Sequence, residues 1–435
     1  MKYFNEKYEC MSREELNKLQ SERLVEVIQR VYDNVKTYRD KMDKAGLKPA
    51  DIKSISDISK LPFTVKQDLR DNYPMGYFAA PKKDIVRVHA SSGTTGKLTV
   101  VGYTKKDIET WAEVCARSLV CAGATQDSIV HVAYGYGLFT GGLGMHYGSE
   151  KLGSITVPIS GGNTGKQIML LQDFEADILC CTPTYAIYIA DELDKLKIDP
   201  KSLKLKAGIF GAEPWTEEMR AEIERRLDIK AYNIYGLSEI SGPGVSMECE
   251  AQEGMHIFED VFYPEIVDPV TLLPVEDGID GELVFTTLTK EGIPLIRYRT
   301  RDITSLTHNQ CKCGRTMVRM ARVHGRTDDM LIIRGVNVFP SQIESVIMKI
   351  GKGVQPHYHI YVDRINRLDV MEIKVEVSEK LFSDEIKYIE AIKKEIATEM
   401  KDNLSINAKI TLVSPNSLPR SEGKAQRVTD NRKNK

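Results

Sequence analysis

The chain has 435 residues, of which 42% are hydrophobic and 28% are charged, the composition of an ordinary globular protein. Its formal net charge of −2 argues against nucleic-acid binding as the protein's main function. A chain of this length is expected to form two or more domains. Neither a signal peptide nor an apolar run of the roughly 20 residues that span a membrane is visible, so we expect a cytoplasmic protein.

The first helical signal begins at Ser12. Ser12 and Glu15 match the capping-box pattern S-x-x-E. Leu24, Ile28 and Val31 then recur at helical spacing. The sequence therefore predicts an amphipathic helix that buries this stripe.

A glycine- and hydroxyl-rich loop follows the apolar run at 85–88. Its glycines let the backbone approach an anion, its hydroxyl and N–H groups can donate to phosphate oxygens, and its lysine adds positive charge. The spacing matches neither the P-loop nor G-x-G-x-x-G. We interpret it as a polyphosphate site, with a plain surface turn as the alternative. Its residues are Ser91, Ser92, Gly93, Thr94, Thr95, Gly96 and Lys97.

Short apolar runs alternate with helical segments between about 85 and 300. The runs include 128–133, 154–157, 178–181, 208–210 and 231–234. This alternation predicts a largely parallel α/β sheet with helices on its faces. Ligands bind at the carboxyl ends of such strands, and the glycine-rich loop and the segments that begin at Gly211 and Tyr235 all follow such runs.

The pattern becomes strand-rich from about 257 to 334, and a smaller α+β unit is expected after it. The clearest strands of the first region are 281–285 and 295–298. In the smaller unit we expect helices at 340–350 and 382–403 and strands at 358–362, 371–377 and 409–413. The polar tail 430–435 is expected to be frayed.

The eight cysteines are sparse and irregularly spaced, unlike a disulfide framework. Cys311 and Cys313, followed by a glycine, resemble one knuckle of a zinc site. The nearest upstream partners are Cys249 and His256, with His308 in reserve. Four protein ligands would leave no open position, which favours a structural ion. Two exposed reduced thiols are the alternative.

Six segments in chain order resemble the core motifs of the acyl- and aryl-adenylate-forming enzymes. They are 91–97, 211–214, 235–239, 298–302, 325–329 and 418–424. The flanking segments 134–142 and 330–344 resemble the phenylacetate–coenzyme A ligases of this superfamily, and the resemblance covers essentially the whole chain. It implies an α/β fold: a large N-terminal adenylate-forming domain with a strand-rich portion, residues 1–327, and a small mobile α+β lid domain, residues 328–435, with the hinge at Asp328.

The resemblance implies ATP-dependent activation of an aryl acid, with phenylacetate preferred, to an acyl-adenylate and then to the coenzyme A thioester. ATP, Mg²⁺ and coenzyme A would be bound, and a homodimer is one expected assembly. Two alternatives stay open. An adenylyltransferase of the same fold would move AMP onto a cofactor hydroxyl, and an idle relative would only bind nucleotide.

The resemblance also assigns roles to residues. Lys424 would be the main catalytic residue, since a cation offsets charge that builds in the transition state, and Glu239 would bind Mg²⁺. Tyr235 would stack on adenine, Asp302 would accept the ribose hydroxyls, and Arg326 would assist. The full nucleotide set is 91–97, Gly211, Ala212, Glu213, Pro214, Tyr235, Gly236, Ser238, Asp302 and Arg326.

The acid pocket is assigned to the segment rich in glycine and aromatic residues. Its residues are Tyr134, Tyr136, Phe139 and Gly141, with plain core packing as the alternative for each aromatic. Arg301 stands where the wider superfamily often has glycine. Candidates for coenzyme A contacts that no motif supports are Lys66, Lys83, His357 and His359.

Overall fold

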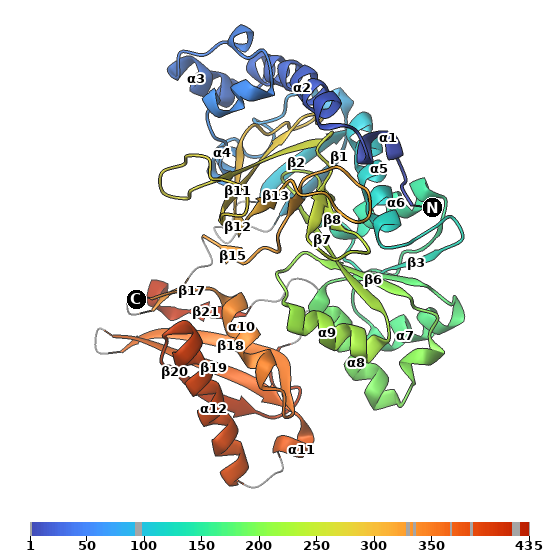
Figure 1. The fold of residues 1–435 in the computed structure, drawn as a ribbon, viewed down its shortest axis with the longest axis vertical. Helices are drawn as coiled ribbons and strands as arrows, with labels where there is room; N and C mark the ends of the chain where they lie inside the picture. Colours follow the sequence, from blue (N-terminus) through green and yellow to red (C-terminus); the bar gives the residue numbers. More distant parts are fainter. Residues whose placement is uncertain are drawn as a thin grey trace.

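The computed structural model describes residues 2–91, 98–327, 331–333, 336–365, 368–382, 386–419 and 427–434. Figure 1 shows a large body formed by the N-terminal three quarters of the chain, with a smaller body of C-terminal elements beside it. In the part of the chain that is described, no helix is long and apolar enough to cross a membrane.

The predicted N-terminal helix is α2 (Arg13–Asn34), and it begins at the capping box. The Ser12 hydroxyl accepts from the Glu15 backbone N–H, and the Glu15 carboxylate accepts from the Ser12 N–H. Leu24, Ile28 and Val31 are fully buried, so the predicted stripe is confirmed. The neighbouring elements are α1 (Glu6–Glu9), α3 (Lys36–Lys44), η1 (Pro49–Asp51), η2 (Ile55–Lys60), α4 (Lys66–Asp71) and η3 (Lys82–Asp84).

A central sheet of strand order β13-β14-β9-β8-β7-β6-β5-β3-β4 organises the large body (Figure 1). The strands β4, β3, β5, β6 and β7 run parallel to one another, and the predicted apolar runs form them. The strand bounds are β3 (Ile129–Val132), β4 (Ile155–Val157), β5 (Ile178–Cys181), β6 (Ala207–Gly211), β7 (Lys230–Leu237), β8 (Gly242–Glu248), β9 (Met255–Ile257), β13 (Leu306–Thr307) and β14 (Arg319–Met320).

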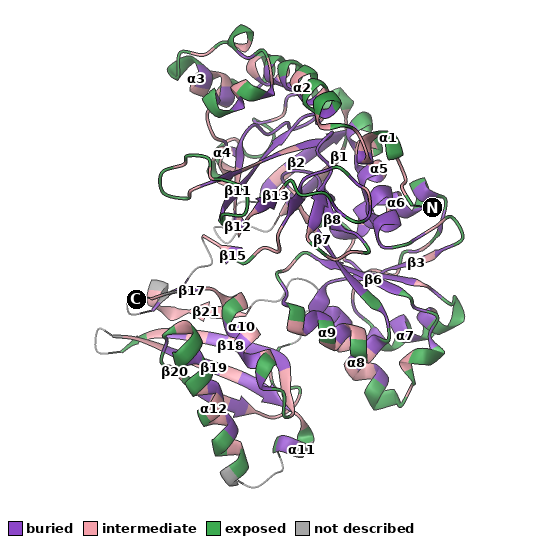
Figure 2. Ribbon diagram, in the orientation of Figure 1, coloured by how far each residue is buried: buried purple, intermediate pink, exposed green. Residues whose placement is uncertain are grey.

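Helices cover both faces of this sheet, because successive strand residues point to opposite sides. In β5, Ile178 and Cys180 join one apolar cluster, while Leu179 and Cys181 join the other. Figure 2 shows the strands buried between the helices. The helices are α5 (Lys105–Cys121) and α6 (Gly141–Leu152) with the first cluster, and α7 (Thr164–Asp173), α8 (Pro183–Leu196) and α9 (Glu217–Leu227) with the second; η4 (Pro200–Ser202) links α8 to β6.

The strand before the glycine-rich loop does not belong to the central sheet. β1 (Ile85–Ser91) pairs antiparallel with β2 (Thr99–Thr104). The loop therefore connects a hairpin, and the prediction that it follows a strand of the parallel sheet is wrong. A local apolar run does not reveal which strand will pair with it. Residues 92–97 themselves lie outside the described part of the chain.

A second sheet of order β10-β11-β12-β15 completes the large body. The predicted strand 281–285 lies within β11, but 295–298 shares only its last residue with β12. Arg297 has a φ of +47°, which interrupts extended backbone, and its guanidinium binds the Glu265 carboxylate. The bounds are β10 (Phe262–Val267), β11 (Gly281–Thr287), β12 (Tyr298–Thr304) and β15 (Gly325–Arg326).

The small body has its own sheet, of order β20-β19-β18-β21, and its own apolar cluster. α10 (Pro340–Ile350) coincides with its predicted range. The predicted frayed tail is wrong, since β21 pairs with β18 and Arg432 forms an ion pair with Asp369. The other bounds are β16 (Leu331–Ile333), β17 (Val336–Val338), β18 (Val354–Ile365), β19 (Leu368–Val377), α11 (Glu379–Phe382), α12 (Ile386–Leu404), β20 (Ala408–Val413), β21 (Val428–Asp430) and η5 (Asn431–Asn434).

A buried ion pair ties α5 to the core of the large body. The Arg117 guanidinium donates to both Asp260 oxygens at 2.8 and 3.3 Å, and it also binds Glu113. The side chains of Arg117 and Asp260 are each only 2% exposed. Removing Arg117 would leave the buried Asp260 carboxylate with only the longer 3.7 Å pair to Arg23.

We predict that Arg117→Met lowers the free energy of unfolding by about 3–5 kcal/mol, the cost of breaking a buried pair. Trp111 and Trp215 lie in the large body, so tryptophan fluorescence during urea titration would report its unfolding. The control is Arg225→Met, whose surface pair with Glu222 should change stability by less than about 1 kcal/mol. Equal losses in the two variants would contradict the prediction.

Candidate active site

A cavity of about 230 Å³ lies where β6 and β7 end. Most of the predicted site residues in the described chain line it, although they come from distant segments. These are Ser91, Tyr134, Phe139, Gly141, Ala212, Glu213, Pro214, Tyr235, Gly236, Ser238, Glu239, Asp302 and Arg326. The carboxyl edge of the parallel strands therefore gathers the motifs, as the α/β pattern predicts.

The remaining predicted residues fall into two groups. Ser92–Lys97, Asp328 and Lys424 lie outside the residues that the structure describes. Of those described, Gly211 and Tyr136 are not among the lining residues.

Gly211 and Tyr136 have packing roles instead. A Cβ on Gly211 would lie 2.2 Å from the Ile234 carbonyl, so only glycine lets β6 and β7 come this close. The Tyr136 hydroxyl lies 3.4 Å from Nδ1 of His146, and the two rings meet edge to face. The place of Tyr136 in the acid pocket stays a prediction.

Glu239 lies in the turn between β7 and β8, and its carboxylate faces the cavity. Its side chain is 6% exposed, and its Oε1 lies 2.9 Å from the Lys66 ammonium. The Ser91 hydroxyl donates to the same oxygen at 3.4 Å. An anionic carboxylate, a cation and the start of the glycine-rich loop thus meet at one point, which suits the binding of a metal–phosphate group.

The buried ammonium group of Lys290 binds the backbone carbonyls of this turn. The Lys290 ammonium donates to the carbonyls of Ile240 at 2.7 Å and Glu239 at 3.2 Å, and it lies 4.6 Å from the centre of the Tyr103 ring. The Tyr103 hydroxyl donates to the Ser241 carbonyl at 3.1 Å. Carbonyl oxygens and a π face replace water around the charge, yet burial still lowers the pKa of Lys290 to about 8.

Asp302 has a hydrogen bond to each carboxylate oxygen. The Tyr235 hydroxyl donates to Oδ2 at 2.6 Å, and Arg326 donates to Oδ1 at 3.2 Å. Burial, and then the charge of Asp302, raise the pKa of Tyr235 well above its usual value. Each carboxylate oxygen can accept more than one hydrogen bond, so Asp302 remains able to accept from a ligand.

Two residues in the segments predicted to bind the nucleotide have a strained backbone. Ala212 has a φ of +71° and Arg301 a φ of +72°, both in the left-handed region that favours glycine. This conformation agrees with the expectation that position 301 can be occupied by glycine. Such strain persists only where the surroundings enforce it, and it is concentrated at functional sites.

Glu213 connects the cavity to the start of α8. Its Oε1 accepts from the Thr184 backbone N–H at 2.8 Å, in the first turn of the helix. Thr182 caps the same helix end by accepting from the Tyr185 N–H. A carboxylate is favourable at a helix N-terminus, which helps to fix Glu213 there.

The opposite wall is aromatic. Tyr134 is buried, and its hydroxyl donates to the Ile209 carbonyl at 3.3 Å. Phe139 is 41% exposed, and its ring lies across Gly141, where a Cβ would approach to 2.4 Å. Glycine therefore leaves room for the ring beside the cavity, as expected for an apolar acid site.

The motifs did not identify every residue that matters here. Lys66 lines the cavity from α4, and no motif marks it. Lys290 lies outside the six motifs. Its contacts join segments about 50 residues apart, so no local pattern could have indicated them. Trp215 also lines the cavity, and its place directly after Pro214 could have indicated it. The candidates His357 and His359 contact Asp191 and Thr429 instead.

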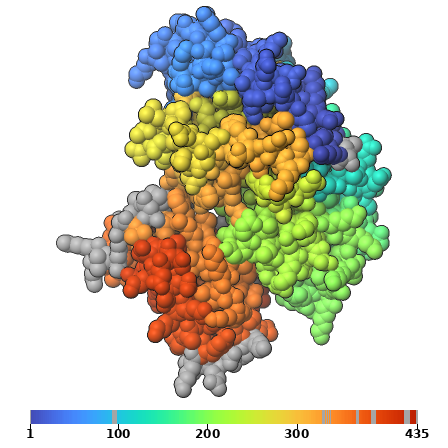
Figure 3. Space-filling model, in the orientation of Figure 1, coloured from blue at the N-terminus to red at the C-terminus, as the bar shows by residue number. Residues whose placement is uncertain are grey.

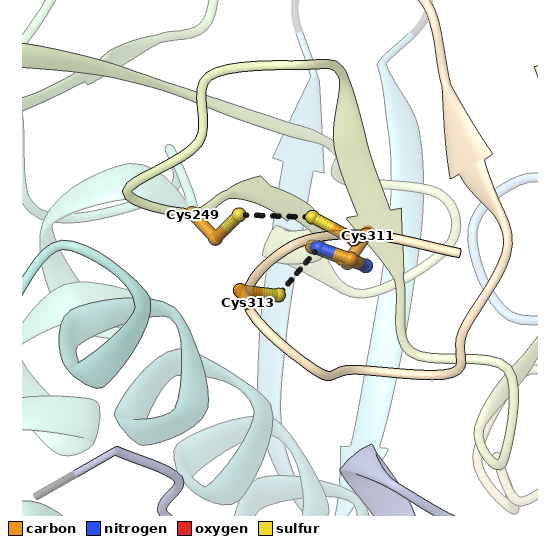
Figure 4. Close-up of side chains that lie close together, drawn as sticks. Cys249, Cys311 and Cys313 are labelled. Atoms are coloured by element: carbon orange, nitrogen blue, oxygen red, sulfur yellow. Dashed lines mark hydrogen bonds between the residues drawn. The ribbon is translucent and has the colours of Figure 1, made fainter. Parts of the chain in front are cut away.

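The predicted metal ligands come together away from the cavity. Cys249, His256, Cys311 and Cys313 are all buried, and their ligand atoms lie within 4.8 Å of one another (Figure 4). The two sulfur atoms of Cys249 and Cys311 are 3.6 Å apart, and Sγ of Cys313 is 3.3 Å from Nε2 of His256. A tetrahedral zinc ion, with bonds of about 2.3 Å to sulfur, would separate two thiolates by about 3.8 Å.

This donor set fits zinc in kind and in spacing. The reserve ligand His308 is exposed and bound to Asp277, so it is not part of the cluster. The alternative of exposed thiols is wrong, since Cys311 and Cys313 are 3% and 1% exposed.

The N-terminal segment packs on the loop that carries two of these cysteines. The Tyr3 hydroxyl donates to the Cys313 carbonyl at 2.8 Å. The Arg315 guanidinium donates to the buried Glu9 carboxylate at 2.7 Å and to the Lys2 carbonyl at 3.0 Å. The first residues of the chain therefore hold the cysteine loop in place.

Comparisons with known proteins agree with this site. Residues 11–288 match the family of AMP-binding enzymes, and residues 335–432 match the AMP-binding enzyme C-terminal domain. The chain therefore belongs to the AMP-binding, adenylate-forming enzymes. The phenylacetate-coenzyme A ligase of Thermus thermophilus is 52% identical, over 98% of each chain. Within the superfamily, the chain belongs to the family of phenylacetate–coenzyme A ligases.

The placement of the small domain matches one state of a solved relative. Against 2-hydroxyisobutyryl-CoA ligase in the postadenylation state with R3-HIB-AMP, the TM-score is 0.93 at 29% identity, over 100% of this chain and 93% of that one. Against the same enzyme with 2-HIB-AMP and CoA in the thioesterification state it is 0.74 at 30% identity, over 99% and 93%. The two domains here are thus arranged as in the postadenylation state.

We predict that Lys290 makes stability depend on pH. Between about pH 8 and pH 10.4 the unfolded chain holds the Lys290 proton more tightly than the folded protein, so stability rises with pH. Relative to Lys290→Met, the wild type should gain about 3 kcal/mol across this window. Urea unfolding at pH 7.5, 9 and 10.5, followed by tryptophan fluorescence, would measure it.

The matched control is Lys201→Met at an exposed position, which should show no such trend. A constant difference between wild type and Lys290→Met at all three pH values would contradict the assignment.

Proposed function

We propose that this protein activates phenylacetate with ATP and transfers the phenylacetyl group to coenzyme A. An oxygen of the acid attacks the α-phosphorus of ATP, the bond to pyrophosphate breaks, and phenylacetyl-adenylate forms. The coenzyme A thiol then attacks the acyl carbon, AMP leaves, and the thiol proton is lost to solvent. The cavity that joins Glu239, Asp302 and the aromatic wall carries this proposal.

The described residues suit the first step. Asp302, fixed by Tyr235 and Arg326, would accept from the ribose hydroxyls. Tyr235 lines the cavity beside Ala212 and would contact adenine. These contacts position ATP, which supplies much of the rate when the protein has little covalent chemistry to perform.

The charged groups at the turn would serve the phosphates. Glu239 would hold Mg²⁺ together with phosphate oxygens, and the ion would offset charge on the leaving pyrophosphate. Lys66 lies 2.9 Å from Glu239 and would pair with a phosphate once the carboxylate binds the ion. Ser91 and the loop 92–97 would bind the β- and γ-phosphates, with Lys424 beside the attacking carboxylate.

Phenylacetate is the acid that the site and its relatives favour. Tyr134 and Phe139 present an apolar wall near Gly141, and the relative at 52% identity is named a phenylacetate-coenzyme A ligase. A flat aromatic ring on a one-carbon arm would fit between them. The domain boundary at 328, the hinge at Asp328, a cytoplasmic location and a homodimer stay predictions.

The cluster of Cys249, His256, Cys311 and Cys313 would hold a structural zinc ion. Four ligands leave no open position for catalysis. The ion would join the β8–β9 segment to the cysteine loop and, through Tyr3, to the N-terminus.

Pyrophosphate release from ATP and Mg²⁺ across an acid panel, with and without coenzyme A, tests the proposed reaction. The panel is phenylacetate, benzoate, indoleacetate, a short fatty acid and no acid. We expect the highest kcat/KM for phenylacetate and sustained turnover only with coenzyme A. Lys424→Ala should slow adenylation by about 10²–10³, the effect of losing one electrostatic donor.

Two results would overturn the proposal. Release that does not depend on acid, together with AMP transfer to an added hydroxylated cofactor, would establish the adenylyltransferase instead. Binding of ATP without any turnover would establish the idle nucleotide-binding protein.

For the metal, we predict about one zinc per chain by mass spectrometry of the purified protein. Cys313→Ser should lose most of the zinc and lower the unfolding temperature, because ligand binding and folding are coupled. Cys180→Ser, a buried cysteine of β5, should keep its zinc. Full zinc content in Cys313→Ser would refute this ligand set.

A further inference from the structure

The small domain contacts the large domain through a few polar side chains. Figure 3 shows its surface, orange to red, against the green surface of α8 and α9. His357 of β18 lies 3.2 Å from Asp191 of α8, and the Ser345 hydroxyl of α10 donates to Glu218 of α9 at 3.2 Å. Arg427, just before β21, donates to the Thr184 hydroxyl at 3.1 Å.

Arg427 brings a largely buried guanidinium to this interface. Its side chain is 14% exposed, and within the small domain it pairs with Glu344 at 2.9 Å and lies 4.5 Å from the centre of the Tyr358 ring. The Tyr358 hydroxyl donates to the same Glu344 carboxylate at 3.0 Å. Glu344 and Tyr358 belong to the same domain as Arg427, so these contacts would persist if the small domain rotated.

Arg427 also donates to the Pro356 carbonyl of the small domain at 3.4 Å, and its other partners belong to the large domain. Thr184 accepts its hydrogen bond, and the nearby charge of Glu213 favours the charged guanidinium. Glu213 lines the cavity and itself accepts from the Thr184 N–H. A rotation of the small domain away from α8 would break these contacts and leave the pair with Glu344 intact.

We propose that Arg427 is a positioning residue that, through Thr184 and Glu213, holds the small domain in the arrangement that matches the postadenylation state. It lies three residues after Lys424 in the sequence, so docking Arg427 would restrain the chain next to the lysine that the proposed function assigns to catalysis. The domain placement, with its TM-score of 0.93 to the postadenylation state, is the arrangement in which this contact exists. The inference rests on the proposed ligase reaction.

Thr184→Val tests the contact without touching the pair inside the small domain, and it keeps the backbone N–H that Glu213 uses. Each half-reaction is measured alone: pyrophosphate release in the absence of coenzyme A, and thioester formation from supplied phenylacetyl-adenylate. We expect adenylation to fall about tenfold, the effect of losing one hydrogen bond to a charged group. Thioester formation should be unchanged or faster, since the other arrangement does not need this contact.

Two further variants sharpen the result. Arg427→Lys keeps a positive charge near Glu344 but loses the planar fork, so it should show the same split. Thr411→Val removes a similar hydroxyl whose partner, Glu372, lies within the small domain, and it should change neither half-reaction.

Equal slowing of both half-reactions, or normal adenylation in Thr184→Val, would overturn the role of Arg427. A wild type that releases no pyrophosphate with any acid would instead overturn the ligase proposal itself. The two failures are therefore separate.

Discussion

The candidate site depends on one tight reversal of the chain, between β7 and β8. At this point the parallel part of the central sheet changes to antiparallel pairing. A Cβ on Gly236 would lie 1.9 Å from the Gly242 carbonyl, so the turn cannot close around any other residue. Lys290 and Tyr103 bind the carbonyls of the turn from behind. The carboxylate of Glu239 can therefore face the cavity in one orientation, and the groups around it are placed relative to it.

The two lysines near that turn, Lys290 and Lys66, have different kinds of partners. Lys290 is enclosed by carbonyls and an aromatic ring, and it stabilises backbone. Lys66 pairs directly with Glu239 at the cavity, where an arriving metal–phosphate group would compete for the same oxygen. One cation thus serves the scaffold, while the other can exchange partners when substrate binds. The same division recurs at Arg427, whose guanidinium has permanent partners in one domain and exchangeable partners in the other.

The sequence predicted the repetitive parts of the fold well, because apolar runs and caps are local signals. It predicted the central parallel strands, α2 and α10, and it predicted the motifs that meet at the cavity. It misplaced β12, since the positive φ of Arg297 interrupts the extended backbone and no local pattern of residues marks it. It did not identify Lys290 or the function of Lys66, because their partners are distant along the chain. It also could not show that Tyr134, and not Tyr136, lines the cavity, since only packing decides which of two nearby tyrosines faces it.

The contact between the first residues and the cysteine loop has a consequence for how the protein is made. Tyr3 and Cys313 are 310 positions apart, so the N-terminal segment leaves the ribosome long before its partner. At ordinary elongation rates that delay is roughly 15–60 s. The large domain can be completed only once the cysteine loop has emerged, and the small domain follows it. Synthesis thus exposes the whole large domain before the small domain has been made.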